Sequence, residues 1–391
     1  MLEKKQIDRM SNNQPSQKKV SAVPRESDTP QVREALEFLT SIVSSACEFK
    51  ASDIHIRAGH QIMMRLDGRI RQVKGSPEMN DEMIERLIFP LMAKYHLILF
   101  KENNQVDLAL SDNDDNRVRV NMFRQLGHLA VVMRVIERNI PRPAELGLPP
   151  QVHNIANMQQ GLVIFSGATG SGKSTSMASL LNEINAERYQ HILTIEDPVE
   201  YVFTERRCVI SQRQIGIDVP DFAQAMRAAL REDPDVILMG EMRDPESMEI
   251  ALTAAETGHL VFTTLHAPTS ADAITRMVSS FRGEEQATIR AKLAHNLRAI
   301  VTQRLLPKIE GGGRTVACEV FTVTPLAREL IIDPLRIKEI KDLIKGGDKV
   351  EGMLHFDEHL EQMVKDERIT ETVALTNASS ATDLALKLKG F

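Results

Sequence analysis

The chain has 391 residues, 42% of them hydrophobic, which predicts two folded domains of ordinary composition and a tail. The formal net charge of −6, the aromatic content of 4% and the absence of tryptophan argue against a general nucleic-acid clamp. The cysteines form no C-x-x-C pair, which excludes a tetracysteine zinc site and suits a reduced, cytosolic protein; they are Cys47, Cys208 and Cys318. No run of about 18 apolar residues occurs, so no transmembrane segment is expected.

The first part of the chain predicts a flexible extension followed by a small mixed domain. Residues 1–30 are rich in Ser, Asn, Gln, Lys and Pro, a composition typical of flexible segments. Residues 31–138 combine helical spacing with strand-like alternation, which predicts an α+β domain. Its expected elements are a helix over 32–46, strands over 52–57, 118–122 and 129–136, and a hairpin over 64–70 that turns at Asp67-Gly68.

A proline-rich stretch separates this domain from the rest of the chain. Residues 139–150 contain Pro141, Pro143, Pro149 and Pro150, which predicts an extended linker. Such a linker would allow one domain to move relative to the other.

Strands and helices alternate over residues 151–391. This alternation predicts an α/β fold with a largely parallel, doubly wound sheet. The expected strands are 162–166, 191–195, 236–240 and 259–264, and the expected helices are 174–185, 221–231, 245–257, 270–281 and 284–304.

A complete Walker A motif follows the first of these strands. It is Gly167-Ala168-Thr169-Gly170-Ser171-Gly172-Lys173-Ser174, between an apolar run and a helix-compatible segment that continues through Thr175. Backbone N–H groups of such a loop and the N-terminus of the helix bind phosphate oxygens. Lys173 is expected to reach the β- and γ-phosphates, and Ser174 to ligate Mg²⁺. The alternative is a glycine-rich turn that binds nothing, and the agreement between motif and context opposes it.

Two further segments carry carboxylates at strand ends. Glu196, Asp197 and Glu200 follow the strand after the Walker helix, at the edge where open α/β sheets bind ligands. Hydrolysis of a phosphoanhydride needs groups that orient water and hold Mg²⁺, and Asp197 is a candidate for the metal. A solvated acidic loop is the alternative. Glu241 ends the strand over 236–240 in a Walker B arrangement, in which Gly240-Glu241 replaces the usual aspartate.

Two histidines bracket the strand over 259–264. His259 and His266 are seven residues apart, so they are expected at opposite ends of the strand and not on one face. A structural role and a role in sensing the γ-phosphate both stay open.

These motifs, together and in this order, resemble those of the type II/type IV secretion "traffic" ATPases, and most closely the PilT-type pilus-retraction motors and their PilU-type relatives. The likeness runs from about residue 35 to the C-terminus. Further matching segments are 51–56, 65–68, 119–121 and 228–235.

The resemblance implies a cytoplasmic homohexamer that hydrolyses ATP with Mg²⁺ and powers type IV pilus retraction. Each subunit would carry a PAS-like N-terminal domain and a RecA-like P-loop core, with ATP between the two. The motor would act on an inner-membrane platform protein, beside a possible paralogous pilus ATPase, without binding nucleic acid directly. It would lie peripherally at the inner face of the cytoplasmic membrane.

The resemblance also implies roles for individual residues. Lys173 and Ser174 match the phosphate and Mg²⁺ binders, Glu200 the glutamate that activates water, and Glu241 the Walker B glutamate. His259 and His266 match the histidine pair of the family. Arg119 and Arg134 match arginines that approach the γ-phosphate, with Arg124 as a weaker candidate.

Other functions stay open at this point. The missing tetracysteine module argues against the extension or secretion branch, but the stretch 324–331 has Leu326-Ala327 where the retraction branch has Ala-Ile. The alternatives are an ATPase for secretion or DNA uptake, a RecA-like nucleic-acid motor, and a non-hydrolysing accessory subunit.

Overall fold

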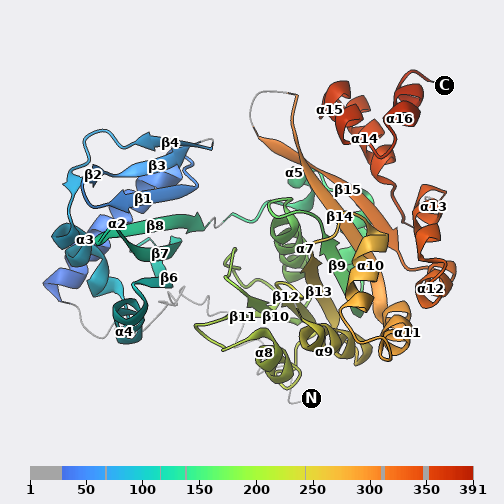
Figure 1. The fold of residues 1–391 in the computed structure, drawn as a ribbon, viewed down its shortest axis with the longest axis horizontal. Coiled ribbons are helices and arrows are strands. Elements are labelled where there is room, and N and C mark those ends of the chain that lie inside the picture. Colours follow the sequence, from blue (N-terminus) through green and yellow to red (C-terminus); the bar gives the residue numbers. More distant parts are fainter. Residues whose placement is uncertain are drawn as a thin grey trace, which may run out of the picture. The chain divides into compact units, whose positions relative to one another are not determined.

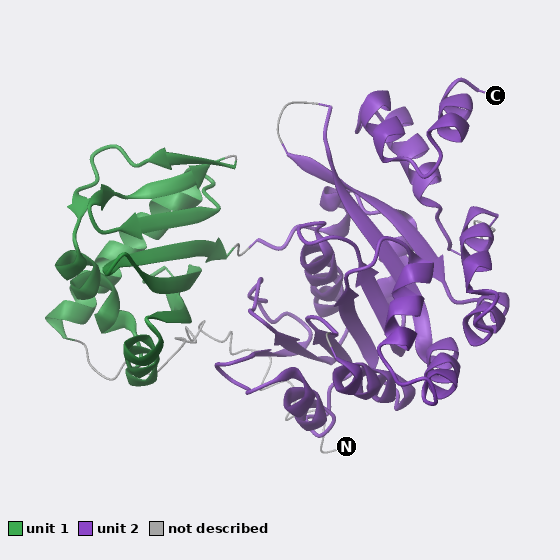
Figure 2. Cartoon of the chain, viewed as in Figure 1, with its two compact units in different colours: residues 1–137 green, residues 138–391 purple. Residues whose placement is uncertain are grey.

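The computed structural model divides the chain into two compact units, Met1–Glu137 and Arg138–Phe391, which we describe separately (Figure 2). The residues it describes are 29–66, 68–114, 116–136, 139–242, 244–309, 313–346 and 352–390. The predicted flexible extension lies outside the described residues, apart from its last two positions. No helix in these described ranges is both long enough and apolar enough to cross a bilayer.

Unit 1 contains a six-stranded antiparallel sheet in the order β4-β3-β1-β8-β7-β6 (Figure 1). Its strands are β1 (Asp53–Arg57), β3 (Met63–Leu66), β4 (Arg69–Gln72), β6 (Gln105–Ser111), β7 (Arg117–Gln125) and β8 (His128–Ile136). The short strands β2 (His60–Gln61) and β5 (Glu78–Met79) pair separately. The helices are α2 (Pro30–Glu48), α3 (Asp81–Ile88) and α4 (Lys94–Asn103), with a 3-10 turn η1 (Phe89–Leu91).

The predicted first helix is confirmed. The side chain of Thr29 accepts a hydrogen bond from the backbone N–H of Val32, and Pro30 occupies the first turn, where its missing N–H costs nothing. The apolar face of α2 packs with α3 on the core side of the sheet. Because strand side chains alternate, the other face of the sheet carries the polar residues.

Unit 2 is built on a seven-stranded sheet in the order β11-β10-β12-β13-β9-β14-β15. All neighbouring strands are parallel except β14 and β15, so the predicted α/β class with a largely parallel sheet is confirmed. The strands are β9 (Gly161–Ser166), β10 (His191–Glu196), β11 (Val209–Gln214), β12 (Val236–Met239), β13 (Leu260–Leu265), β14 (Leu297–Pro307) and β15 (Arg314–Thr322).

Helices cover both faces of this sheet (Figure 1). Leu162 and Ile164 of β9 pack in one apolar cluster and Val163 and Phe165 in another, which explains why the strand is an unbroken apolar run. The helices are α5 (Pro143–Leu146), α6 (Pro150–His153), α7 (Lys173–Glu187), α8 (Phe222–Ala229), α9 (Pro245–Glu256), α10 (Ser270–Ser279), α11 (Gln286–Asn296), α12 (Pro325–Ile332), α13 (Ile340–Lys345), α14 (Phe356–Lys365), α15 (Glu371–Asn377) and α16 (Ala381–Leu388), with 3-10 turns η2 (Asn154–Asn157) and η3 (Ile337–Glu339).

Two predictions along the chain were wrong. The stretch 139–150 is not an extended linker, because Pro143 and Pro150 each begin a short helix, α5 and α6, at the position where proline fits a helix. The helix expected over 284–304 ends at Asn296, and the chain continues as β14. Backbone pairing with β9 and β15 stabilises β14 as a strand, and this pairing outweighs the helical propensity of its residues.

Candidate functional site

The carboxyl ends of four parallel strands of unit 2 meet at one cavity. The cavity has a volume of about 500 Å³ and lies where β9, β10, β12 and β13 end. Its polar lining comes from the Walker A loop and from the segments that follow the other three strands. The lining includes Thr169, Gly170, Lys173, Ser174, Glu196, Asp197, Glu200, Gly240, Glu241, Thr264 and His266.

The conformation of the Walker A loop depends on its glycines. Gly167 has φ of +136°, and a Cβ at this position would lie 2.5 Å from the carbonyl oxygen of Gln303 and 2.8 Å from Oγ of Ser171. Gly172 has φ of +90° and caps α7 directly before Lys173. These positions therefore require glycine, and the N-terminus of α7 points its free N–H groups at the loop.

Lys173 is buried at the start of α7. Its Nζ donates hydrogen bonds of 2.9 Å to the carbonyl oxygens of Gly167 and Ala168. Burial lowers the pKa of Lys173, and the nearby carboxylates of Glu241 and Glu200 act in the opposite direction. The cation and the two predicted catalytic carboxylates therefore lie close enough to interact.

The acidic segment after β10 delivers its carboxylates to the cavity. Glu196, Asp197 and Glu200 all line it, and the Asp197-Pro198 peptide bond is cis. Glu196 is the most buried of the three, and burial raises its pKa to about 7. Oε2 of Glu196 accepts a long hydrogen bond of 3.4 Å from the backbone N–H of Glu200. Burial therefore gives Glu196 an environment that favours its neutral form, unlike an ordinary surface carboxylate.

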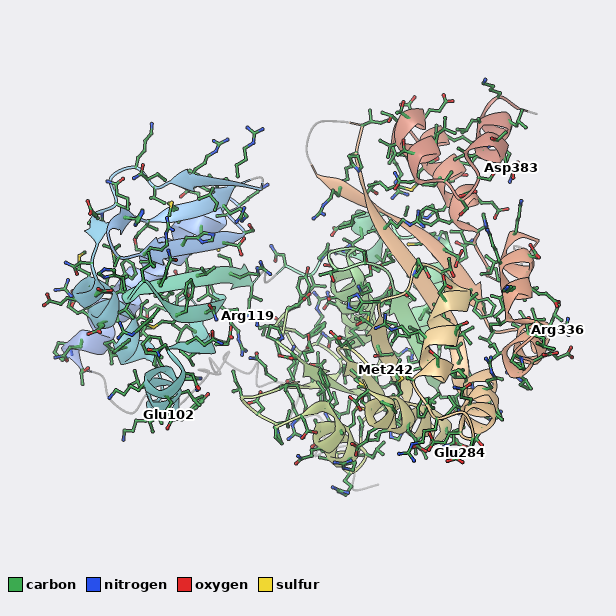
Figure 3. All side chains as sticks on the ribbon, in the orientation of Figure 1. Glu102, Arg119, Met242, Glu284, Arg336 and Asp383 are labelled. Atoms are coloured by element: carbon green, nitrogen blue, oxygen red, sulfur yellow. The ribbon has the colours of Figure 1, made fainter. Side chains whose placement is uncertain are left out.

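Glu241 reaches the cavity because the chain after β12 is fixed by its neighbours. The backbone N–H of Gly240 donates to the carbonyl oxygen of Ile195 at 2.8 Å, and Oγ1 of Thr264 donates to the carbonyl oxygen of Gly240 at 2.7 Å. Met242, labelled in Figure 3, is buried and donates its backbone N–H to Thr264 at 3.3 Å. The Walker B segment is therefore held between β10 and β13.

The two histidines lie at opposite ends of β13, as predicted. His266 lines the cavity, and its carbonyl oxygen accepts a hydrogen bond of 2.8 Å from Nη1 of Arg276. His259 precedes the strand, and its Nδ1 lies 2.9 Å from the carbonyl oxygen of Ala254 and 3.2 Å from Oγ1 of Thr257. A strand of this length spans about 20 Å, so the structure does not bring His259 to the cavity of its own subunit.

The predicted arginines belong to unit 1 and not to the unit that contains the cavity. Arg119 of β7 and Arg134 of β8 are directly opposite each other in the sheet (Figure 3 labels Arg119). Nε of Arg134 donates to Oδ1 of Asp53 at 3.0 Å, and Arg119 pairs with Asp107 at 3.7 Å. Arg124 instead lies over the ring of Phe100, at 5.6 Å from its centroid.

Two contacts beside the loop were not predicted from the sequence. Nε2 of Gln303 donates to Oγ of Ser176 at 2.9 Å, and the hydroxyl of Tyr201 lies 2.9 Å from Oγ1 of Thr175. Gln303 was not identified because a helix, and not a strand, was predicted over its position. Tyr201 ends the acidic segment, and its place next to three cavity carboxylates was the signal that could have found it.

The oxygen donors of the cavity fit a magnesium ion held together with a phosphate ligand. Ser174, Asp197 and Glu241 offer one hydroxyl and two carboxylates. Within the described ranges, no three His, Cys, Asp or Glu side chains are grouped as a metal site of their own. Mg²⁺ usually keeps several waters and is bound through few protein oxygens plus substrate phosphates, which this donor set would supply.

A family model described as "Type II/IV secretion system protein" matches residues 29–387. The chain belongs to this family. It is 39% identical to the type IV pilus retraction ATPase PilT of Pseudomonas aeruginosa, over 83% of this chain and 94% of that protein. It is also 39% identical to the type IV pilus ATPase PilU of the same organism, over 86% of this chain and 88% of PilU.

A solved structure is similar over nearly its whole length. The crystal structure of the pilus retraction motor PilT with bound ADP aligns with a TM-score of 0.82 and 39% identity, covering 89% of this chain and 99% of that one. The predicted fold class and the family resemblance drawn from the motifs are confirmed.

Proposed function

We propose that this chain is a Mg²⁺-dependent ATPase whose cavity lies at the carboxyl edge of the unit 2 sheet, and that hydrolysis powers type IV pilus retraction. The observation that carries the proposal is one cavity lined by Lys173 on a Walker A loop, by Glu200 and by Glu241. Similarity to PilT and to PilU supports the pilus assignment.

The chain's own residues suggest how hydrolysis would proceed. Glu200 would orient a water and accept its proton as the water oxygen attacks the γ-phosphorus. Lys173 and the N–H groups at the start of α7 would stabilise the negative charge left on ADP as the phosphoanhydride bond breaks. Ser174, with Asp197 and Glu241 through bound water, would hold Mg²⁺, which neutralises phosphate charge.

Two arginines are further proposed participants in the reaction. Arg119 and Arg134 would contact the nucleotide phosphates, and such an arginine is worth about 10³–10⁵ in rate in related chemistry. The assembly proposed is a cytoplasmic homohexamer that works at the inner membrane on a pilus platform protein. A paralogous pilus ATPase is a further proposed partner.

The biological role is tested in cells. Deleting the gene should leave excess surface pili and abolish twitching motility, and the wild-type gene should restore both. A gene carrying Lys173→Ala should restore neither, although its product accumulates to the wild-type level. Normal pili with lost protein secretion or lost DNA uptake would contradict the retraction role and favour those alternatives.

A further inference from the structure

The part of unit 2 that carries Glu200 is held by side chains and not by a backbone ladder. Residues 197–203, which we call the Glu200 segment, are all described by the structure and belong to neither a helix nor a strand. Backbone N–H and C=O groups that are withdrawn from water need hydrogen-bond partners. Neighbouring side chains supply several of the partners of the Glu200 segment.

The last residues of β10 and β11 present polar side chains on one face of the sheet. The two strands are parallel neighbours (Figure 1), with Thr194 opposite Gln212 and Glu196 opposite Gln214. Because strand side chains alternate, these four side chains share one face. The apolar residues of the same face join Phe203 in one apolar cluster. The Glu200 segment therefore lies along this face.

The carboxamide of Gln212 binds the Glu200 segment at two points. Its Nε2 donates a hydrogen bond of 2.8 Å to the carbonyl oxygen of Tyr201, and its Oε1 accepts one of 2.9 Å from the backbone N–H of Phe203. In a parallel ladder, one backbone residue bonds the same two groups of its neighbour. The side chain of Gln212 therefore takes the place of a strand residue directly after Glu200.

The other side-chain contacts of this backbone are longer. Oε1 of Gln214 accepts from the N–H of Val199 at 3.4 Å, and Oε2 of Glu196 accepts from the N–H of Glu200 at 3.4 Å. Bonds of 2.8 and 2.9 Å are close to the usual length, whereas 3.4 Å is beyond it. The path of the chain at Glu200 therefore depends most on Gln212.

We propose that Gln212 is a positioning residue that directs the carboxylate of Glu200 toward the attacking water. Gln212 itself is not one of the described residues that line the cavity, so it acts through the backbone of the Glu200 segment. A general base has to lie within hydrogen-bond reach of its proton, and a displacement of about 1 Å can cost about 10²-fold in rate. This inference rests on the proposed ATPase function and adds to it a residue outside the sequence motifs.

Kinetics of the full chain with a nearly isosteric change test the proposal. Gln212→Met keeps the length of the side chain and removes both hydrogen bonds, so kcat should fall about 10- to 100-fold. The affinity for nucleotide should stay near the wild-type value, because the Walker A loop is unchanged. The matched control is Gln286→Met in α11: Gln286 is also half-buried and donates to the carbonyl oxygen of Phe281 at 3.0 Å, away from the cavity. This control should leave kcat unchanged.

A double variant separates positioning from mere stability. If Gln212 acts through Glu200, Gln212→Met should lower kcat little further once Glu200→Gln has removed the carboxylate. All assays are run below the lowest Tm of the set. Equal kcat values for Gln212→Met and Gln286→Met would overturn the inference. A loss of the same size with and without the Glu200 carboxylate would overturn it as well.

A milder variant keeps the test decisive if Gln212→Met does not fold. Gln214→Met removes only the long bond to Val199, so kcat should fall by about two- to fivefold, less than one ordinary hydrogen bond or about its value. In that case, kcat of Gln214→Met equal to that of Gln286→Met would overturn the inference. A wild-type chain without ATPase activity would instead refute the proposed function itself.

Discussion

The hydroxyl of Tyr201 lies 2.9 Å from the hydroxyl of Thr175, and this contact joins the acidic segment to the first turn of the Walker helix. Thr175 follows Ser174, the predicted Mg²⁺ ligand, and Tyr201 follows Glu200, the predicted catalytic carboxylate. The contact therefore links the Walker helix to the acidic segment directly beside Ser174 and Glu200.

Removing this hydroxyl should loosen the site without destroying it. Tyr201→Phe should lower the free energy of unfolding by about 1 kcal/mol, the usual net value of one hydrogen bond, and should weaken nucleotide binding several-fold. Urea unfolding and nucleotide titration measure the two effects. Tyr189→Phe is the control, because Tyr189 is largely exposed and does not line the cavity. Equal behaviour of the two variants would contradict a role for the contact.

The close approach at Gly167 predicts a strong effect of a single methyl group. Gly167→Ala would place Cβ against the carbonyl oxygen of Gln303 and force the loop to move, in addition to a backbone strain of about 1–3 kcal/mol. Nucleotide affinity should fall by about tenfold or more. Gly216→Ala is a matched control, because its φ of +79° also disfavours alanine but no atom lies within 4 Å of the added carbon. Equal nucleotide affinities of the two variants would show that the close contact is unimportant.

The carboxylate of Glu200 should matter for turnover and not for binding. Glu200→Gln removes the proton acceptor but keeps the shape of the side chain, so kcat should fall by about 10²–10⁴ while ATP affinity stays near the wild-type value. Glu256→Gln, an exposed glutamate at the end of α9, is the control. Loss of ATP binding with Glu200→Gln would make Glu200 a structural carboxylate.

Much of this site could be predicted because its residues are adjacent in the sequence to the strands that position them. The Walker loop, the acidic segment and Glu241 each directly follow a buried strand, and parallel pairing brings the ends of these strands to one edge. His259 shows the limit of this reasoning. It flanks β13, as His266 does, but it lies at the amino end of that strand, far from the cavity.

The parts that could not be predicted depend on contacts between distant residues. Gln303 reaches the Walker helix only because β14 pairs with β9, and local propensity predicted a helix there. The β-branched residues Ile300, Val301 and Thr302 within that run were a signal for a strand. The pairing of Asp53 with Arg134, far away in the sequence, likewise follows from the register of β1 on β8.

A buried histidine predicts how stability changes with acid. His359 is a buried residue of α14, and its Nδ1 accepts a hydrogen bond of 2.9 Å from the backbone N–H of Cys318. Burial, followed by the charge of Arg368, lowers the pKa of His359 to about 4. Because the unfolded state takes up this proton at an ordinary histidine pKa, the stabilisation is complete above about pH 6.5 and is lost as the pH falls toward 4.

The loss should be on the order of 3 kcal/mol in the free energy of unfolding over that pH range. Urea unfolding of the wild type and of His359→Asn at several pH values measures it. The variant should be less stable at neutral pH but should lose less stability than the wild type between about pH 6.5 and pH 4. Parallel curves for the two proteins would show that His359 does not carry this pH dependence.

The most direct test of the account is phosphate release by the purified full chain with ATP and Mg²⁺. The wild type should hydrolyse ATP, Lys173→Ala should show no turnover and weakened nucleotide binding, and the exposed-lysine control Lys341→Ala should match the wild type. Undiminished steady-state hydrolysis by Lys173→Ala, or no affinity of the wild type for adenine nucleotides with Mg²⁺, would contradict the assignment of the nucleotide site.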